Sequence, residues 1–225
     1  MATPRLVIQP VTDRRQVKDF VLFPFRLYRN DPFWVPPLIG DRMDHFDPEK
    51  NPFFAHAAVQ LFRALRDGET VGTIAAIADD KHVEVWHEPV GFFGEFECID
   101  DPAVAHALLD AAREWLAGRG REVMRGPLNM NINEEVGLLV DGFDGPPAVM
   151  MTYNPPYYQR LLEGYGLAKA KDLHAYKVDI AAIAPDLSNI SERVRRMAKV
   201  SVERYRVQMR QVNLKDIAGE LEHIK

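Results

Sequence analysis

The chain has 225 residues, of which 47% are hydrophobic and 27% charged, and its formal net charge is -5 at pH 7. This composition is typical of a globular chain, and the acidic balance argues against uniform attraction to nucleic acid or to an anionic membrane. The single cysteine, Cys98, excludes an intramolecular disulfide, and charges interrupt every apolar run, so we expect a cytoplasmic protein without a membrane span.

The N-terminal quarter predicts a strand, a helix and a long loop. Residues 5–11 predict the strand, and Thr12 or Asp13 is a suitable N-cap for the helix that follows. The apolar residues of this helix recur at helical spacing: Val17, Phe20, Val21 and Phe25. Pro24 lies inside the pattern and predicts a kink or two short helices. Residues 29–54 are rich in proline, aspartate and aromatic residues, so we expect an ordered loop with at most one short helix.

The middle of the chain predicts a hairpin, a further strand and a helix. Asp67 and Gly68 form a dipeptide suited to a tight turn between the β-rich runs of residues 57–79, so these two strands should be antiparallel. Residues 90–99 predict another strand. The helix after it carries one apolar stripe: Val104, Leu108, Ala111, Trp115 and Leu116.

Three more elements complete the predicted sheet. Residues 119–128 predict a strand, residues 157–167 a short helix, and residues 168–180 a closing strand. An antiparallel start followed by alternating strands and helices predicts a mixed α/β (α+β) fold. Its central sheet has antiparallel N-terminal strands and flanking helices.

The last quarter of the chain has a different pattern. Residues 185–206 predict an amphipathic helix, and its basic side chains are interpreted as a solvated face. Residues 205–225 repeat the plan of residues 4–23, with a strand, a polar turn and an amphipathic helix. We therefore expect one domain over residues 1–183, and in residues 184–225 a helix and the start of a second unit of a longer protein.

The order of elements resembles the GNAT superfamily of acyl-CoA-dependent N-acyltransferases over residues 5–180. The stretch LLEGYGL, residues 161–167, is similar to the end of that superfamily's late helix. The segments FWVPP, FECIDD, RGPLNMNINEE, GLLVDGF and YNPPYY are similar to a bacterial GNAT-like subgroup. The resemblance implies a GNAT-like fold, an acyl-CoA cofactor such as acetyl-CoA, and a small amine as the acyl acceptor.

The resemblance also implies a cofactor-binding turn at the start of the predicted helix. In the superfamily, the backbone N–H groups of an R/Q-x-x-G-x-G/A turn bind the CoA pyrophosphate. Asp100 stands at the Arg/Gln position of this chain, and two aspartates oppose a pyrophosphate, so we expect a degenerate turn with Asp100 or Asp101 as the N-cap. The residues placed to contact the cofactor are Cys98, Ile99, Ala103, Val104 and Ala105.

A polar stretch, residues 125–137, predicts a substrate site. Its alternating amides are Asn129, Asn131 and Asn133. In an extended conformation these amides point the same way, and Glu134 or Glu135 follows as a candidate proton acceptor. The alternative is a turn-rich loop whose asparagine side chains bond to the backbone. Tyr153, in the segment YNPPYY, is a candidate for the wall of the substrate pocket.

A tyrosine is the candidate acid. Many members of the superfamily protonate the departing CoA thiolate with a late-helix tyrosine, and the matching residue here is Leu162. Tyr158 lies four residues earlier on the same helical face and Tyr165 three residues later, so either is a candidate substitute. The alternative is that both pack at the edge of the core. The predicted catalytic residues are therefore Glu134 and Tyr158.

Two functions remain open at this point. The first is an acyl-CoA-dependent N-acyltransferase that acts on a small amine. The alternative is a non-catalytic GNAT-like binding or scaffold domain that supports a catalytic second unit or a homo-oligomer. The seven histidines show no compact ligand spacing, so we expect no metal site, and we expect neither a nucleic acid nor a membrane as a partner.

Overall fold

The structure is a computed structural model that describes residues 5–177, 190–207 and 210–223. The chain divides into two compact units, Met1–Leu173 and His174–Lys225, and each is described by itself. Among the described residues, no helix combines the length and the apolar composition needed to cross a bilayer.

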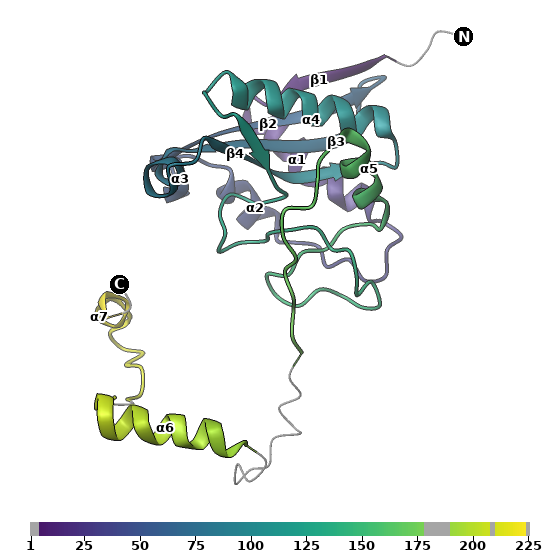
Figure 1. The fold of residues 1–225 in the computed structure, drawn as a ribbon. Helices are drawn as coiled ribbons and strands as arrows, with labels where there is room; N and C mark the ends of the chain where they lie inside the picture. Colours follow the sequence, from purple (N-terminus) through teal and green to yellow (C-terminus); the bar gives the residue numbers. More distant parts are fainter. Residues whose placement is uncertain (1–4, 178–189, 208–209, 224–225) are drawn as a thin grey trace. The chain divides into compact units, whose positions relative to one another are not determined.

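The first unit is built around one five-stranded sheet in the order β1-β2-β3-β4-β5 (Figure 1). The strands are β1 Leu6–Pro10, β2 Ala57–Arg66, β3 Glu69–Asp79, β4 Val90–Cys98 and β5 Val123–Arg125. The first four pair antiparallel, and β5 pairs parallel with β4. Asp67 and Gly68 turn β2 into β3 with φ angles of 52° and 86°, which confirms the predicted hairpin.

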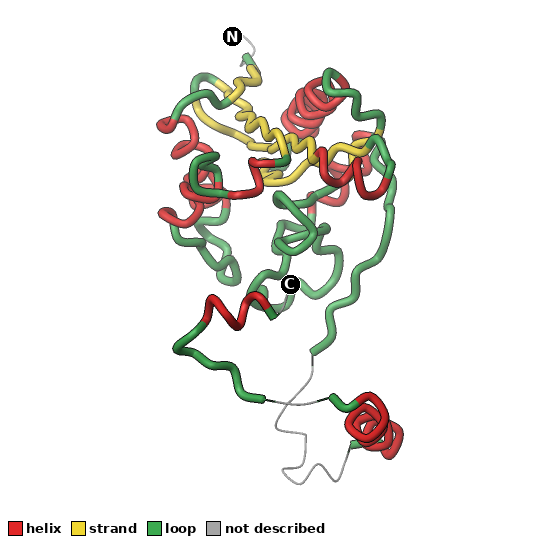
Figure 2. The backbone as a smooth tube through the Cα atoms, turned by 90° about the vertical axis from the view of Figure 1, so that its left-hand side faces the viewer, coloured by secondary structure: helices red, strands yellow, loops and turns green. Residues whose placement is uncertain are grey.

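Helices cover both faces of this sheet. They are α1 Arg14–Leu27, α2 Ile39–His45, the 3-10 turn η1 Pro52–Ala55, α3 Asp80–Trp86, α4 Pro102–Ala117 and α5 Tyr157–Tyr165. The helices α4 and α5 share one core cluster with the sheet, whereas α1 belongs to a second cluster on the other face. In Figures 1 and 2, α4 and α1 accordingly lie on opposite sides of the strands. The apolar stripe of α4 packs on the middle of the sheet, with Val104 and Leu108 against Gly72 of β3 and Leu116 against Gly91 of β4.

The predicted mixed α/β GNAT-like fold is confirmed. Antiparallel strands β1 to β4, a helix directly after β4, a parallel strand β5 and a further helix α5 follow the order that the resemblance implies. Residues 168–177 contain no strand, so the predicted closing strand is wrong over these residues, and its last three residues lie outside the described part.

Two other elements differ from the sequence prediction. The helix α1 runs without a break through Pro24, so the predicted kink is wrong; Phe20 and Val21 before the proline and Leu27 after it all pack in core clusters against the sheet. The helix α3 was not predicted, and it begins where the side chain of Asp79 accepts hydrogen bonds from two backbone N–H groups.

The second unit contains the helices α6 Glu192–Tyr205 and α7 Ile217–Glu222. The predicted amphipathic helix is thus present from residue 192, and residues 185–189 lie outside the described part. The strand predicted after it is not formed in residues 206–207 and 210–212, and residues 208–209 are not described. The final predicted helix corresponds to α7, whose N-cap is Asp216.

Candidate functional site

The strand β4 carries a bulge at Glu95, whose φ is 50°. The register against β3 shifts at this point, so the alternation of side chains changes along β4. Phe93 and Phe96, three residues apart, both pack into the core cluster that contains α4. Glu95 and Glu97 consequently both line a cavity on the α1 side of the sheet.

This cavity has a volume of about 180 Å³. Its apolar wall comes from α1 and from the loop that follows, through Phe20, Val21, Pro24, Trp34 and Val35. A second wall comes from two irregular segments, residues 127–138 and 147–154. Glu95 and Glu97 of β4 also line the cavity, which therefore has both acidic and apolar lining residues.

Glu97 is held by two tyrosine hydroxyls. Tyr28 donates a hydrogen bond to Glu97 Oε2 at 2.8 Å, and Tyr158 donates to the same oxygen at 2.6 Å. Among the described residues, no side chain or backbone group bonds to Oε1. Burial raises the pKa of Glu97 from its ordinary value of 4.5 to about 7, and the two hydrogen bonds counteract part of this rise. A carboxylate with this pKa and one free oxygen can accept a proton near neutral pH.

Glu95 already has a cationic partner. Its Oε2 forms an ion pair with Arg42 of α2. His45 Nε2 lies 3.7 Å from Glu95 Oε1 and 3.6 Å from Glu134 Oε2, and burial lowers the pKa of His45. No three histidine, cysteine, aspartate or glutamate side chains within the described ranges are arranged to hold a metal ion.

A close backbone contact fixes the asparagine loop against β4. A Cβ atom at Gly94 would overlap the carbonyl oxygen of Leu128, so only glycine permits this approach. The approach lets Asn129 Oδ1 accept a hydrogen bond from the Glu95 N–H at 2.8 Å. Asn129 Nδ2 donates in turn to Glu135 Oε2 at 3.1 Å.

The rest of this loop adopts the turn-rich alternative. Asn131 Nδ2 donates to Glu134 Oε1 at 2.8 Å, and Asn131 Oδ1 accepts from the Asn133 N–H at 2.8 Å. Asn129 and Glu135 line the cavity, whereas Asn131, Asn133 and Glu134 are not among its lining residues. The prediction that the three asparagine amides point the same way is therefore wrong, because the segment forms turns in which local hydrogen bonds hold these side chains. Burial raises the pKa values of both Glu134 and Glu135.

Tyr153 lines the cavity and ties its two walls together. Its hydroxyl lies 2.8 Å from both carboxylate oxygens of Asp31. Asp31 also accepts hydrogen bonds from the N–H groups of Phe33 and Trp34. Trp34 stacks on Tyr28 at a centroid distance of 5.1 Å. Aromatic side chains therefore connect the Asp31 hydrogen bonds to the Tyr28 hydroxyl that binds Glu97.

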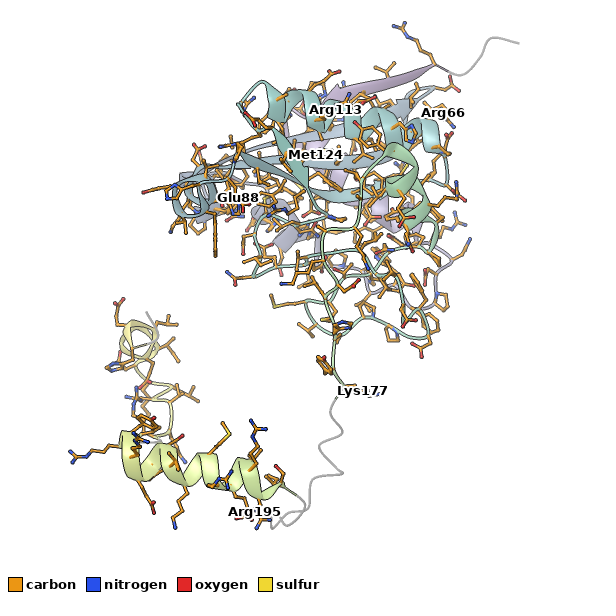
Figure 3. All side chains as sticks on the ribbon, in the orientation of Figure 1. Arg66, Glu88, Arg113, Met124, Lys177 and Arg195 are labelled. Carbon is orange, nitrogen blue, oxygen red and sulfur yellow. The ribbon has the colours of Figure 1, made fainter. Side chains whose placement is uncertain are left out.

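The start of α4 is capped by its own chain. Asp101 Oδ1 accepts a hydrogen bond from the Ala103 N–H at 2.9 Å, and the Asp101 carbonyl accepts from the Ala105 N–H at 3.2 Å. Arg66, labelled in Figure 3 at the end of β2, donates to Asp101 Oδ2 at 2.6 Å. Asp100 pairs with Arg160 and does not cap the helix. Val104 and Ala105 are buried.

The end of β4 is also occupied. The Cys98 N–H donates to the Tyr158 hydroxyl at 2.8 Å, and the Cys98 carbonyl accepts from the Tyr157 hydroxyl at 2.7 Å. The Ile99 N–H donates to the Val71 carbonyl at 3.2 Å. These groups and the capped start of α4 do not fit a CoA pyrophosphate, because its phosphates would meet two aspartates and few free N–H donors. The cavity is lined by Phe96 and Glu97 but not by residues 98–106.

The sequence interpretation missed the groups around Glu97. Glu95 and Glu97 stand in an otherwise apolar strand. An alternating strand pattern alone would place these side chains in solvent, but carboxylates isolated in an apolar strand are also a signal for a functional site. Tyr28, Asp31 and Arg42 carry no comparable signal, since only the fold brings residues 28–42 to β4. The predicted pair Glu134 and Tyr158 has no direct hydrogen bond between its members, and Tyr158 bonds to Glu97 instead.

Two curated proteins are similar to the chain, and no family model matches it. A protein named bacterial ceramide synthase, from Caulobacter vibrioides, is 45% identical over 184 residues, which make up 81% of this chain and 48% of that protein. Protein YghO from Escherichia coli is 36% identical over 197 residues, or 86% of this chain and 50% of that protein. The chain thus spans about half the length of the curated relatives it matches.

Solved acetyltransferase structures are also similar to the chain. An aminoglycoside acetyltransferase from an uncultured soil metagenomic sample, in complex with sisomicin, is 10% identical, with a TM-score of 0.49 over 77% of this chain and 95% of that one. The aminoglycoside N-acetyltransferase AAC(6')-Iy in complex with CoA is 13% identical, with a TM-score of 0.46 over 79% of this chain and 97% of that one.

Proposed function

We propose that this chain binds the amine acceptor of an N-acyltransferase and removes a proton from its nitrogen. The acceptor we propose is a long-chain amine. The observation that carries the proposal is Glu97, a cavity-lining carboxylate with a pKa of about 7, whose Oε2 is held by two tyrosines and whose Oε1 has no hydrogen bond from the described residues.

The charges of the cavity favour a cationic ligand. Glu95, Glu97 and Glu135 line it, and Arg42 is the cation among its lining residues and is already paired with Glu95. A primary amine is protonated at neutral pH, so it enters such a cavity as an ammonium ion. The ammonium must lose a proton before its nitrogen can attack an acyl carbon, and Glu97 is the group placed to accept it.

The apolar wall gives the acceptor its second feature. The side chains of Phe20, Val21, Pro24 and Trp34 offer a surface for hydrocarbon next to the carboxylates. The relative from Caulobacter vibrioides is named a ceramide synthase, and a ceramide is a long-chain amino alcohol acylated on nitrogen. Both facts support an amine that carries a hydrocarbon chain over the small polar amine that the sequence analysis expects.

The acyl donor that we propose is a thioester. In the reaction a nitrogen–carbon bond forms and a carbon–sulfur bond breaks. The ammonium gives one proton to Glu97 before the attack, and the second proton of the nitrogen passes to the leaving thiolate, which departs as a thiol. Residues 98–105 do not fit a CoA pyrophosphate, so we assign no nucleotide contact to this chain. The alternative of a non-catalytic binding unit shares the amine site but lacks the proton transfer.

The experiment separates binding from chemistry. Decylamine and decanol are titrated into the chain by calorimetry, and Trp34 fluorescence reports occupancy, with Trp34→Phe identifying the signal. Decylamine should bind and decanol should bind at least about tenfold more weakly. Amide formation is then measured by mass spectrometry with an N-acetylcysteamine thioester, which offers the acyl group without a nucleotide. Equal affinity for decylamine and decanol would contradict the amine site, and amine binding without amide formation would favour the non-catalytic alternative.

A further inference from the structure

Two loop segments next to the cavity share an unusual composition. Residues 35–40 read VPPLIG and residues 145–151 read GPPAVMM, and neither contains a charged or hydrogen-bonding side chain. Each pairs two prolines with bulky aliphatic side chains. The prolines restrict the backbone, so the aliphatic groups that follow them are held in place at little entropic cost.

Both segments form part of the same cavity and continue outward from it. Val35 and Met151 line the cavity and are nevertheless exposed. Farther along the two segments, Leu38 is 72% exposed and Val149 is 92% exposed, and neither lines the cavity. The hydrogen bonds between Tyr153 and Asp31 join the chain next to the two segments, and Val35 and Met151, which both line the cavity and are exposed, mark its opening. We call this exposed set, with Ile39 and Met150, the apolar rim.

The geometry points to a lipid bilayer as the partner of the apolar rim. This inference rests on the proposed function, because a long-chain amine resides in a bilayer and must pass this opening to reach Glu97. An apolar surface of this kind on a water-exposed loop marks a contact with a protein or a membrane. A protein seated on the rim would block the opening, whereas a lipid layer covers the rim and delivers the amine through it.

Charge complementarity selects the kind of bilayer. The rim is uncharged, and the nearest charged residues beside its two segments are acidic, with Asp31 before the first segment, Asp41 after it and Asp144 before the second. Such a surface suits zwitterionic lipid, because it offers no basic cluster for an anionic one. The composition argument against anionic membranes therefore stands, and the attraction inferred here comes from burial of the aliphatic side chains.

The test uses sedimentation of the chain with phosphatidylcholine vesicles. The variant Leu38→Asp with Val149→Asp places charges on the rim without altering the cavity lining. The matched control is Val85→Asp with Trp86→Asp on α3, where both side chains are also exposed but lie outside the cavity. The wild-type chain and the control should bind the vesicles, and the rim variant should bind at least about tenfold more weakly.

Three results would overturn the inference: equal vesicle binding by the rim variant and the control, binding that requires anionic lipid, or a dimer in light scattering that only the rim variant abolishes. Hexylamine, which is short enough to bind from water, reports on the proposed function separately through Trp34 fluorescence. The rim variant should bind hexylamine like the wild type. If the wild-type chain did not bind hexylamine, the proposed function would be contradicted. The vesicle experiment would still decide whether the apolar rim binds a bilayer.

Discussion

Tyr158 donates its hydroxyl hydrogen to Glu97 Oε2 at 2.6 Å and accepts a hydrogen bond from the Cys98 N–H at 2.8 Å. One buried hydroxyl therefore links the candidate base to the strand end where the GNAT resemblance implies a cofactor contact. A hydroxyl that already donates to a carboxylate is poorly suited to protonate a thiolate as well. Tyr158 thus acts through Glu97, as a positioning residue.

The affinity for an amine should depend on pH through Glu97. Its pKa of about 7 means that the carboxylate gains its charge as the pH rises through neutrality, while a long-chain amine stays protonated. Decylamine should bind about tenfold more tightly at about pH 8 than at about pH 6, measured by calorimetry. The Glu97→Gln variant should lose this dependence. A pH-dependent affinity that persists in the variant would place the titrating group elsewhere.

The same substitution should remove most of the chemistry. Glutamine keeps the size of Glu97 and can still accept hydrogen bonds from both tyrosines, but it cannot take a proton. Amide formation should fall about 100-fold or more. The control is Asp100→Asn, which changes an exposed carboxylate paired with Arg160 and should leave the rate unchanged. A similar loss in both variants would argue against a specific role for Glu97.

Removal of one tyrosine hydroxyl should move the pH profile in a defined direction. The hydrogen bond from Tyr28 stabilises the charged carboxylate, so its loss in Tyr28→Phe should raise the pKa of Glu97 further. The rate of amide formation should then reach its half-maximal value at a higher pH than in the wild type. The control is Tyr165→Phe, because the Tyr165 hydroxyl bonds to Asp110. A shift to lower pH in Tyr28→Phe would contradict this assignment.

The fold was largely predictable from the sequence because its signals are local. Asp67 and Gly68 specify a turn through backbone conformation, and Asp101 specifies the start of α4 through a side-chain cap. The candidate site was less predictable because it depends on contacts between distant residues. Tyr28 meets Glu97 across 69 positions of the chain, and no periodicity encodes that contact.

The asparagine loop shows the second limit of the sequence. Alternating asparagines look the same whether a segment is extended or folded into turns, and only the approach of Gly94 to Leu128 decides between the two. The approach brings Asn129 to the Glu95 N–H and leaves Asn131 to bond within its own loop. The pattern of residue types therefore located the loop, but it did not identify which residues of the loop line the cavity.

The stability of the chain should fall with rising pH through the same carboxylate. The pKa of Glu97 is about 7 in the folded chain against an ordinary 4.5, so the folded chain keeps a proton that the unfolded chain has lost. Its stabilising effect is complete below about pH 4.5 and is lost as the pH rises through about 7. At about 1.4 kcal/mol per pKa unit the loss amounts to about 3 kcal/mol. Urea unfolding of the wild type and Glu97→Gln from pH 5 to pH 8 measures it, and parallel curves would contradict it.

Substitution of Gly94 should disrupt the site through the backbone. An added Cβ would overlap the Leu128 carbonyl, which cannot move aside as a flexible side chain can. In Gly94→Ala the segment must shift, breaking the bond from the Glu95 N–H to Asn129, so we expect about 1–3 kcal/mol of destabilisation and weaker decylamine binding. The control is Gly40→Ala in α2, where a Cβ meets no atom within 4 Å and helix propensity favours alanine. If Gly94→Ala were as stable as the control and bound decylamine normally, the contact between β4 and the loop would not be what builds the cavity.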